Sequence, residues 1–168
     1  LHGQRPLLLK SPSHTAKIRL LLELFPDARF VHIHRHPYEV YQSQLKFADT
    51  VLWHTYLQRP DRARLGDEIL ARYRTVFDAL FRDVPSIPAG HFCEVSFAEL
   101  ERDPVGTVER IYAALGMDGF APLRPKLETY VGSLRNYEKN TFAPLDEPTR
   151  AKVRAAAAAC FDRWGYSR

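Results

Sequence analysis

The sequence of 168 residues lacks the features of a disulfide-rich or membrane-spanning protein. Its two cysteines, Cys93 and Cys160, cannot form a disulfide framework, so we expect reduced thiols and a cytoplasmic location. The longest apolar runs, such as the three leucines at 7–9, are too short to span a bilayer. The chain begins at Leu1 rather than Met, which favours a fragment or a protein whose start was removed. A signal or membrane anchor before Leu1 therefore stays open.

The composition is that of one globular domain, spanning 1–168. Hydrophobic residues make up 45% and charged residues 26%, and a chain of this length buries roughly two thirds of its unfolded surface. The net charge is +4, which favours an anionic partner. The excess is mostly arginine spread along the chain, without the lysine-rich run of a nucleic-acid-binding arm. We therefore expect no nucleic-acid partner.

Hydrophobic periodicity predicts alternating strands and helices. Short apolar runs at 7–10 and 28–34 are typical of buried strands, and the segment at 91–97 is predicted as a third. Helical spacing is predicted after the first strand, after Pro37, over 69–81, after Asp103-Pro104, and from about 147 to 164. Strand, helix, strand, helix within the first fifty residues predicts an α/β fold, a three-layer parallel sheet flanked by helices.

Polar residues follow the first two predicted strands. The segment at 10–14 supplies Lys10 and His14, and the segment at 35–43 supplies Arg35 and Ser43. Ligands of open α/β sheets bind at the carboxyl ends of the strands, where helix amino termini also offer free amides. An arginine fork with a hydroxyl two helical turns away suits a phosphate or sulfate group. The sequence thus predicts an oxyanion site at this edge.

These segments resemble the sulfotransferases that use 3′-phosphoadenosine 5′-phosphosulfate (PAPS), in their bacterial and carbohydrate-type branch. In that family a strand ending in arginine leads into a helix with serine eight residues on, and the pair holds the donor's 3′-phosphate; Arg35 and Ser43 have that spacing. LLLKSPSH at 7–14 is similar to the family's lysine-containing segment. FCEVSFAELERDPVGTVERIYAALGM at 92–117, YEKNTF at 137–142 and RWGY at 163–166 are similar to its later segments.

The resemblance implies a P-loop NTPase-like sulfotransferase fold that is truncated at the amino end. The family's phosphosulfate-binding loop, of Gly-Thr-Thr type, is missing, since Gly3 is followed by Gln-Arg-Pro. The expectation is one sulfotransferase-like domain without its first strand and that loop. The aromatic-Glu-Asp-Leu run of the family is here Phe97-Ala98-Glu99-Leu100, a departure that weakens any adenine-binding role carried over to this turn.

The implied activity is sulfuryl transfer from PAPS to a hydroxyl or amine, without a metal. Such a transfer needs a base for the acceptor's proton and positive charge near the leaving group. His14 is the candidate base, since a histidine pKa lies near neutrality, and Lys10 is the candidate cation. Arg135 and Lys139 are candidates for the 3′-phosphate, as basic residues are in some relatives. The acceptor, a small molecule, carbohydrate or peptide, stays open, as does the oligomeric state.

Several alternatives compete with this interpretation. His32, His34 and His36 alternate like metal ligands, but the sequence offers no acidic or cysteine partner nearby, and hydrogen-bonded histidines are the simpler reading. Without the neighbouring motifs, Arg35 would be interpreted as an arginine in a surface salt bridge, and Ser43 as a serine on the surface of a helix. At the level of function, the rivals are a nucleotide kinase-like P-loop enzyme, a non-catalytic nucleotide-binding fragment, and a basic nucleic-acid binder.

Overall fold

The computed structural model describes residues 7–58, 61–134 and 139–168. The sheet in these residues consists of two parallel strands, β1 (Phe30–His34) and β2 (Phe92–Ser96). They pair in register, so that Phe30 lies beside Phe92 and His34 beside Ser96. Parallel neighbours need a long crossover, and here it runs through two helices, α2 (Pro37–Thr50) and α3 (Arg62–Asp83). Both strands therefore end at the same edge of the sheet, the carboxyl edge.

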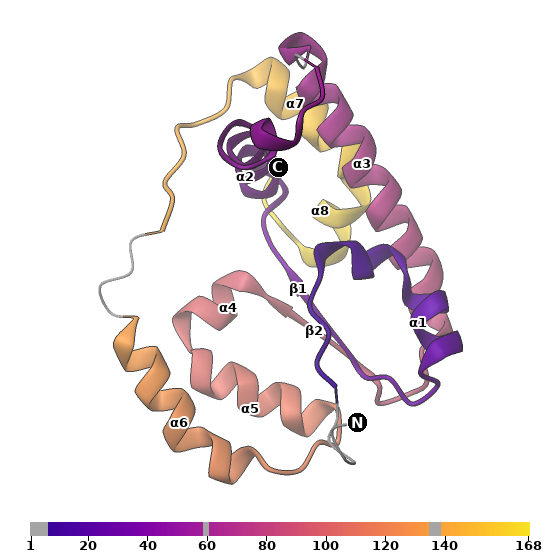
Figure 1. Cartoon of the computed structure of the whole chain (residues 1–168), viewed down its shortest axis with the longest axis vertical. Coiled ribbons are helices and arrows are strands. Elements are labelled where there is room, and N and C mark those ends of the chain that lie inside the picture. Colours follow the sequence, from indigo (N-terminus) through magenta and orange to yellow (C-terminus); the bar gives the residue numbers. More distant parts are fainter. Residues whose placement is uncertain (1–6, 59–60, 135–138) are drawn as a thin grey trace.

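The other elements are short turns of 3₁₀ helix and further α-helices (Figure 1). The 3₁₀ turns are η1 (Pro12–Ala16), η2 (Leu52–Thr55) and η3 (Val84–Ser86). The helices are α1 (Ile18–Leu24), α4 (Phe97–Arg102), α5 (Pro104–Ala114), α6 (Phe120–Ser133), α7 (Glu147–Ala156) and α8 (Ala158–Trp164). Figure 1 shows α2, α3, α7 and α8 on one side of the strands and α4, α5 and α6 on the other. The predicted α/β fold with a parallel sheet between helices is confirmed.

Two hydrophobic cores hold these groups of helices in place. The larger lies among α2, α3, α7 and α8 and is made of Tyr41, Ile69, Leu70, Tyr73, Val153, Ala157, Cys160 and Phe161. The smaller joins β2 to α5 through Val95, Ile111 and Leu115. Fully burying one such large apolar side chain stabilises the fold by about 1.5–3 kcal/mol. The larger core thus fixes α2, the helix that follows β1, against the body of the domain.

Residues near the carboxyl edge set where the helices begin. Pro37 occupies the first turn of α2, where its missing N–H costs nothing, and the His36 ring accepts a hydrogen bond from the Tyr38 backbone N–H at 3.3 Å. Ser96 begins α4 with a reciprocal capping box to Glu99. Asp103 caps α5 through the Gly106 N–H, as the sequence predicts. These caps place the starts of α2 and α4 directly at the strand ends.

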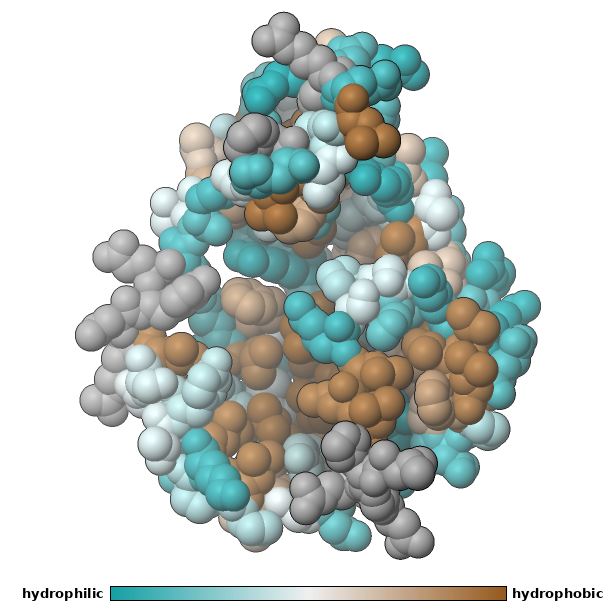
Figure 2. Space-filling view, viewed as in Figure 1, coloured by the Kyte–Doolittle hydropathy of each residue, from teal (hydrophilic) through white to brown (hydrophobic). Residues whose placement is uncertain are grey.

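The face of β1 turned away from α3 is largely uncovered. Val31 and Ile33 are 44% and 47% exposed, and among the described elements α5 packs mainly against β2. Leu7, Leu8 and Leu9 are exposed as well, Leu8 at 92%. Figure 2 shows solvent-exposed apolar residues near the centre of the visible face. None of the described helices is both long and apolar enough to cross a membrane.

Several sequence predictions about individual elements are wrong. The run at 7–10 forms no strand, so the described sheet has two strands instead of the predicted three. The last predicted helix is divided at Ala157 into α7 and α8, and the predicted helix at 69–81 is longer, beginning at Arg62. Helix α6 was not predicted, since Pro122 and Pro125 within it are helix-breaking signals. The run at 7–10 is apolar enough for a strand, but it has no hydrogen-bonded neighbour here.

Candidate functional site

Arg35 leaves the carboxyl end of β1 on the side of the sheet that faces α4. Its Nε donates to Glu39 Oε2 at 2.5 Å, an ion pair between residues one helical turn apart. Its guanidinium carbon lies 4.5 Å from the centre of the Phe97 ring, a cation–π contact with the first residue of α4. The side chain is 31% exposed. Arg35 is thus held from both helices that begin at this edge, and part of its guanidinium still meets solvent.

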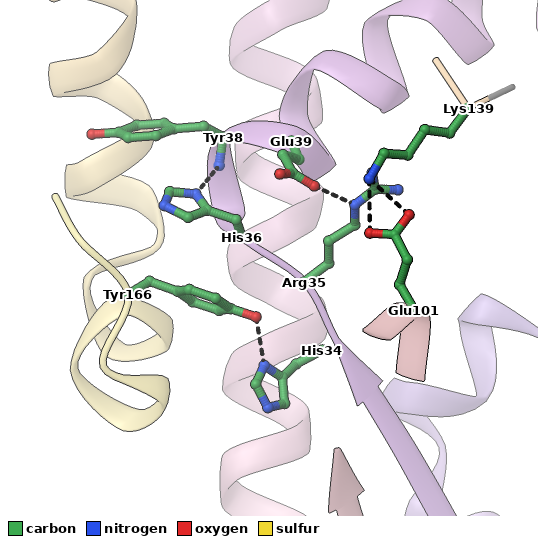
Figure 3. Close-up of polar contacts among 8 residues, drawn as sticks. All are labelled: His34, Arg35, His36, Tyr38, Glu39, Glu101, Lys139 and Tyr166. Atoms are coloured by element: carbon green, nitrogen blue, oxygen red, sulfur yellow. Dashed lines mark hydrogen bonds and ion pairs between the residues drawn. The ribbon is translucent and has the colours of Figure 1, made fainter. Parts of the chain in front are cut away.

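Lys139 reaches the same helix from the late loop. Its ammonium group contacts both carboxylate oxygens of Glu101 at 2.7 Å (Figure 3). Glu101 is four residues after Phe97, so the two side chains project from one face of α4. Arg35 on Phe97 and Lys139 on Glu101 therefore bring two of the predicted phosphate-binding residues to one helix face. Arg135, the third basic candidate, lies outside the described residues.

The segment that carries Lys139 is also tied to α2. Gln42 Nε2 donates to the carbonyl of Ala143 at 2.5 Å, and Lys46 Nζ donates to Asn140 Oδ1. The segment at 139–143 thus runs from α4 to α2 and bridges the two helices that begin at the carboxyl edge. Its contacts fix the position of Lys139 relative to the helix that follows Arg35.

Ser43 lies on the second turn of α2 and is half-buried. Glu39 and Ser43 are four residues apart within α2 and so lie on one face of the helix, while Arg35, which precedes the helix, contacts Glu39. Within the described part of the chain, no other residue takes a hydrogen bond from the Ser43 hydroxyl or gives one to it. Ser43 thus has no hydrogen-bond partner among the described residues, and its role in binding a phosphate stays a prediction.

Lys10 and His14 come from the segment before α1. Lys10 is exposed, and His14 is half-buried in η1, which packs against α3. No hydrogen bond or ion pair among the described residues joins either side chain to Arg35, Ser43 or Lys139. The contacts of the described residues therefore do not link the predicted catalytic residues to the predicted phosphate-binding ones, and the catalytic roles of Lys10 and His14 stay predictions.

The three alternating histidines serve as anchors for the carboxyl-terminal segment. His34 Nδ1 lies 2.8 Å from the Tyr166 hydroxyl, and the ring stacks on Trp164 with centroids 4.6 Å apart and planes 6° apart. His32 Nδ1 lies 2.9 Å from Glu94 Oε1, on the neighbouring strand. Figure 3 shows His34 and His36 turned toward Tyr166, and Arg35 turned the opposite way. Alternation along β1 thus sends the histidines to one face and Arg35 to the other.

The electrostatics of this histidine face follow from its burial. Burial lowers the pKa of His34 below its ordinary value, outweighing the opposing effect of Glu94. Burial raises the pKa of Tyr166 to about 12, and the carboxylates of Glu39 and Glu99 act in the same direction. A neutral His34 ring is therefore the form that this packing favours. Among the residues with assigned positions, no group of three metal-binding side chains occurs.

Comparison with known proteins identifies the family. The profile of the family described as "Sulfotransferase family" matches residues 2–122, more than half of the chain. The chain belongs to the sulfotransferase family. This membership confirms the resemblance to sulfotransferases drawn from the sequence motifs. The matched region contains both strands and the Arg35, Glu39, Ser43 and Phe97 side chains.

Two curated sulfotransferases are similar to this chain over nearly its whole length. They are named omega-hydroxy-beta-dihydromenaquinone-9 sulfotransferase Stf3, from Mycobacterium bovis and Mycobacterium tuberculosis. Each is 32% identical over 165 residues, which is 98% of this chain and 42% of the relative. The chain therefore spans less than half the length of the curated sulfotransferases it matches.

A solved structure shares the fold. The crystal structure of sulfotransferase STF9 from Mycobacterium avium superposes with a TM-score of 0.74 at 24% identity. The match covers 92% of this chain and 41% of the other. At this level of identity the likeness concerns the fold alone, and it confirms the predicted sulfotransferase-type α/β arrangement.

The sequence did not predict the residues that contact Arg35, Lys139 and His34 in the structure. Glu39 was detectable, because a carboxylate four residues after Arg35 at the start of a helix is a recognisable ion-pair spacing. Phe97 and Glu101 were not, because their contacts with Arg35 and Lys139 depend on how β2 pairs with β1. Tyr166 is more than a hundred residues from His34 in sequence, and no local pattern joins them.

Proposed function

We propose that this chain binds PAPS and takes part in transferring its sulfuryl group to an acceptor. The observation that carries the proposal is Arg35 at the carboxyl edge, with its guanidinium oriented by Glu39 and Phe97. Membership of the sulfotransferase family supports it. The 3′-phosphate of the donor binds the outer N–H groups of Arg35 and the Ser43 hydroxyl. These residues fit an anion, since the fork of an arginine matches two phosphate oxygens and the Ser43 hydroxyl has no partner in the described part of the chain.

We further propose that Lys139 and Arg135 add positive charge around the same phosphate. Lys139 supports this because its pairing with Glu101 puts it on the face of α4 that Arg35 also contacts. The carboxylate of Glu101 then acts as a counter-ion that holds the ammonium group in place. Arg135 belongs to the proposal on its sequence position alone.

The proposed chemistry is an in-line displacement at sulfur. A bond forms between the acceptor oxygen and sulfur, and the bond from sulfur to the bridging oxygen of the donor breaks, which releases adenosine 3′,5′-bisphosphate. His14 takes the proton that the acceptor hydroxyl loses. Lys10 stabilises the negative charge that develops on the leaving phosphate.

The test is ligand-induced thermal stabilisation. Adenosine 3′,5′-bisphosphate at 100 times its Kd should raise the melting temperature by roughly 5–11 °C. Arg35→Ala should reduce the shift. Arg29→Ala is the matched control, because Arg29 is exposed and precedes β1 at the opposite end of the strand. An equal shift in the wild type and Arg35→Ala, or none in the wild type, would sink the proposal.

We also propose that the sulfotransferase domain is incomplete in these 168 residues and lacks the strand and loop that bind the 5′-phosphosulfate. The exposure of Val31 and Ile33 supports this, because the strands of a parallel sheet are normally covered on both faces. It favours a second candidate function, bisphosphate binding without turnover by this chain alone. Chromatographic assay of sulfated product, run beside the binding measurement, separates the two: binding with turnover would reject the incomplete-domain proposal.

For the acceptor, we propose a small molecule with a hydroxyl group on a largely apolar body. The two curated sulfotransferases similar to this chain carry a menaquinone derivative in their names. The exposed apolar side chains of residues 7–9, next to the proposed base segment, support an apolar acceptor. Competition assays with an apolar alcohol and a sugar of similar size test this, and preference for the sugar would reject it.

We propose a cytoplasmic location, which the free thiols of the chain support. Cys93 and Cys160 are both free, and burial raises the pKa of the Cys160 thiol to about 11, which keeps it in the unreactive protonated form. Fractionation of cells that express the protein would decide the location, and recovery in an oxidising compartment would reject it.

A further inference from the structure

The Arg35 guanidinium is fixed by two contacts of different kinds. Glu39 accepts a hydrogen bond from Nε at 2.5 Å, and the Phe97 ring lies 4.5 Å from the guanidinium carbon. The first contact sets the rotation of the group within its plane, and the second sets the direction of the plane itself. Together they specify an orientation that neither contact specifies alone.

These two contacts leave the outer edge of the guanidinium free. An arginine has five N–H donors in a rigid fork, and Glu39 uses the one on Nε. Among the described residues, none accepts a hydrogen bond from the four N–H groups on the two terminal nitrogens, and these groups are the ones that meet two oxygens of a phosphate group. Since immobilising a flexible side chain on binding weakens affinity, a fork that is already oriented binds more tightly.

The backbone around Arg35 is held independently of Glu39. His34, the preceding residue, is bonded to Tyr166 and stacked on Trp164, and the ring of His36, the following residue, accepts from the Tyr38 N–H. Figure 3 shows these contacts on the side of β1 opposite to Glu39. The aromatic anchors thus set where the Arg35 Cα lies, and Glu39 acts on the side chain only.

Glu39 lies at the surface, at the start of α2. Its side chain is 48% exposed, and it lies in the first turn of α2, where the helix dipole favours a negative charge. Removing the carboxylate therefore leaves no buried group without a partner. A substitution at this position reports on the orientation of Arg35 more than on the stability of the fold.

We propose that Glu39 is a positioning residue for donor recognition: its carboxylate holds the Arg35 guanidinium so that the free N–H edge faces the anionic phosphate of the donor. This inference rests on the proposed function above. The competing account is that Glu39 blocks Arg35 and must be displaced by the phosphate. The two accounts give opposite signs for the effect of removing the carboxylate.

Two substitutions at Glu39 separate the accounts. Glu39→Gln keeps a carbonyl oxygen that accepts from Nε and removes the charge, whereas Glu39→Ala removes both. If Glu39 positions Arg35, Glu39→Ala should weaken binding by about three- to tenfold, and Glu39→Gln should stay within about twofold of the wild type. If Glu39 competes with the phosphate, both substitutions should tighten binding, because each removes a negative charge from the site.

The experiment is titration calorimetry of the chain with adenosine 3′,5′-bisphosphate at fixed ionic strength. Glu68→Gln is the control, since Glu68 is exposed on α3 and makes no ion pair among the described residues. Phe97→Leu serves as a second test, because it keeps an apolar side chain but removes the ring, and it should also weaken binding. Unchanged or tighter binding by Glu39→Ala overturns the inference.

The outcomes for Glu39 and Arg35 are distinguishable. Loss of binding in Arg35→Ala together with wild-type binding in Glu39→Ala would reject the positioning role and leave the proposed function standing. Wild-type binding in Arg35→Ala, or no binding by the wild type, would reject both. Melting curves of each variant without ligand show whether a loss of affinity comes from unfolding, and rescue by Glu39→Gln marks the hydrogen bond as the cause.

Discussion

Replacing Tyr166 with phenylalanine should release the carboxyl-terminal segment from β1 at one defined point. The substitution removes the hydroxyl that lies 2.8 Å from His34 Nδ1 and leaves the ring in place. The packing of the Tyr166 ring against His36, with centroids 4.9 Å apart, is retained. The change therefore isolates a single hydrogen bond between two parts of the chain that are far apart in sequence.

The expected loss follows from the partners. A hydrogen bond of this kind contributes about 0.5–1.5 kcal/mol net, and the half-buried Nδ1 that loses its partner adds to the cost within that range. For a domain of this size, a loss of about 1 kcal/mol lowers the melting temperature by roughly 2–4 °C. In urea it lowers the midpoint by about 0.3–1 M at an unchanged slope.

The assay is urea unfolding at pH 7.5, followed by circular dichroism, for the wild type, Tyr166→Phe, His34→Phe and the double variant. Since the two side chains contact each other, the cycle should show a coupling free energy of about 0.5–1.5 kcal/mol. Additive single effects would refute the reasoning, because they would mean that the two groups do not interact in solution.

Three further outcomes are expected. Phe161→Ala should cost about 3–5 kcal/mol in unfolding free energy, because Phe161 is among the most deeply buried side chains of the larger core; a cost below 1 kcal/mol would contradict its placement. Gly106→Ala should lower the free energy of unfolding by about 0.5–2 kcal/mol, since the added Cβ would lie 2.1 Å from an Asp103 carboxylate oxygen and displace the cap of α5. Adding Asp103→Ala to this variant should lower the stability little further, because both substitutions remove the same cap. If the two losses are fully additive in thermal unfolding, they do not share this cause. Burial lowers the pKa of His34 in the folded state, so the unfolded chain binds the imidazole proton more tightly than the folded chain does. The contribution of His34 to the free energy of unfolding should therefore be fully present above about pH 6.5 and be lost as the pH falls through the pKa of the folded state. The urea midpoints at pH 7.5 and 5.5 should differ less in His34→Phe than in the wild type, and an equal difference would contradict the lowered pKa of His34.

The sequence predicts a helix or strand correctly where residues within that element, such as a capping residue or a proline, determine where it begins. Pro37 after a strand predicts the start of α2, and Asp103-Pro104 predicts the cap and first turn of α5; both are confirmed. Local signals failed where the deciding contact lay elsewhere. The run at 7–10 has the composition of a strand, but a strand needs a hydrogen-bonded neighbour, and composition does not say whether one is present. Helix α6 forms in spite of its prolines, with Leu123 and Leu127 partly covered.

In the candidate site as well, features set by local geometry were predictable and features set by tertiary contacts were not. Arg35 follows the end of β1 and Ser43 lies on α2, as the local strand and helix signals predict, and their phosphate-binding role stays a prediction. The distribution of the histidines and Arg35 to opposite faces also follows from local alternation. The contacts that orient Arg35 and Lys139 come from α4, which reaches the site only because β2 pairs in parallel with β1. Such tertiary contacts leave no spacing in the sequence from which to predict them.

The proposal that Arg35 binds the 3′-phosphate of the donor is tested most directly by comparing two ligands and two proteins. Adenosine 3′,5′-bisphosphate and adenosine 5′-monophosphate differ by the 3′-phosphate that Arg35 is proposed to bind, so the ratio of their Kd values measures that phosphate alone. With charge-assisted hydrogen bonds contributing about 1.5–3 kcal/mol, the wild type should prefer the bisphosphate by roughly 10- to 150-fold. Arg35→Ala should reduce the preference to within about threefold, the remainder due to nearby positive charge. A preference in Arg35→Ala equal to that of the wild type would contradict the account.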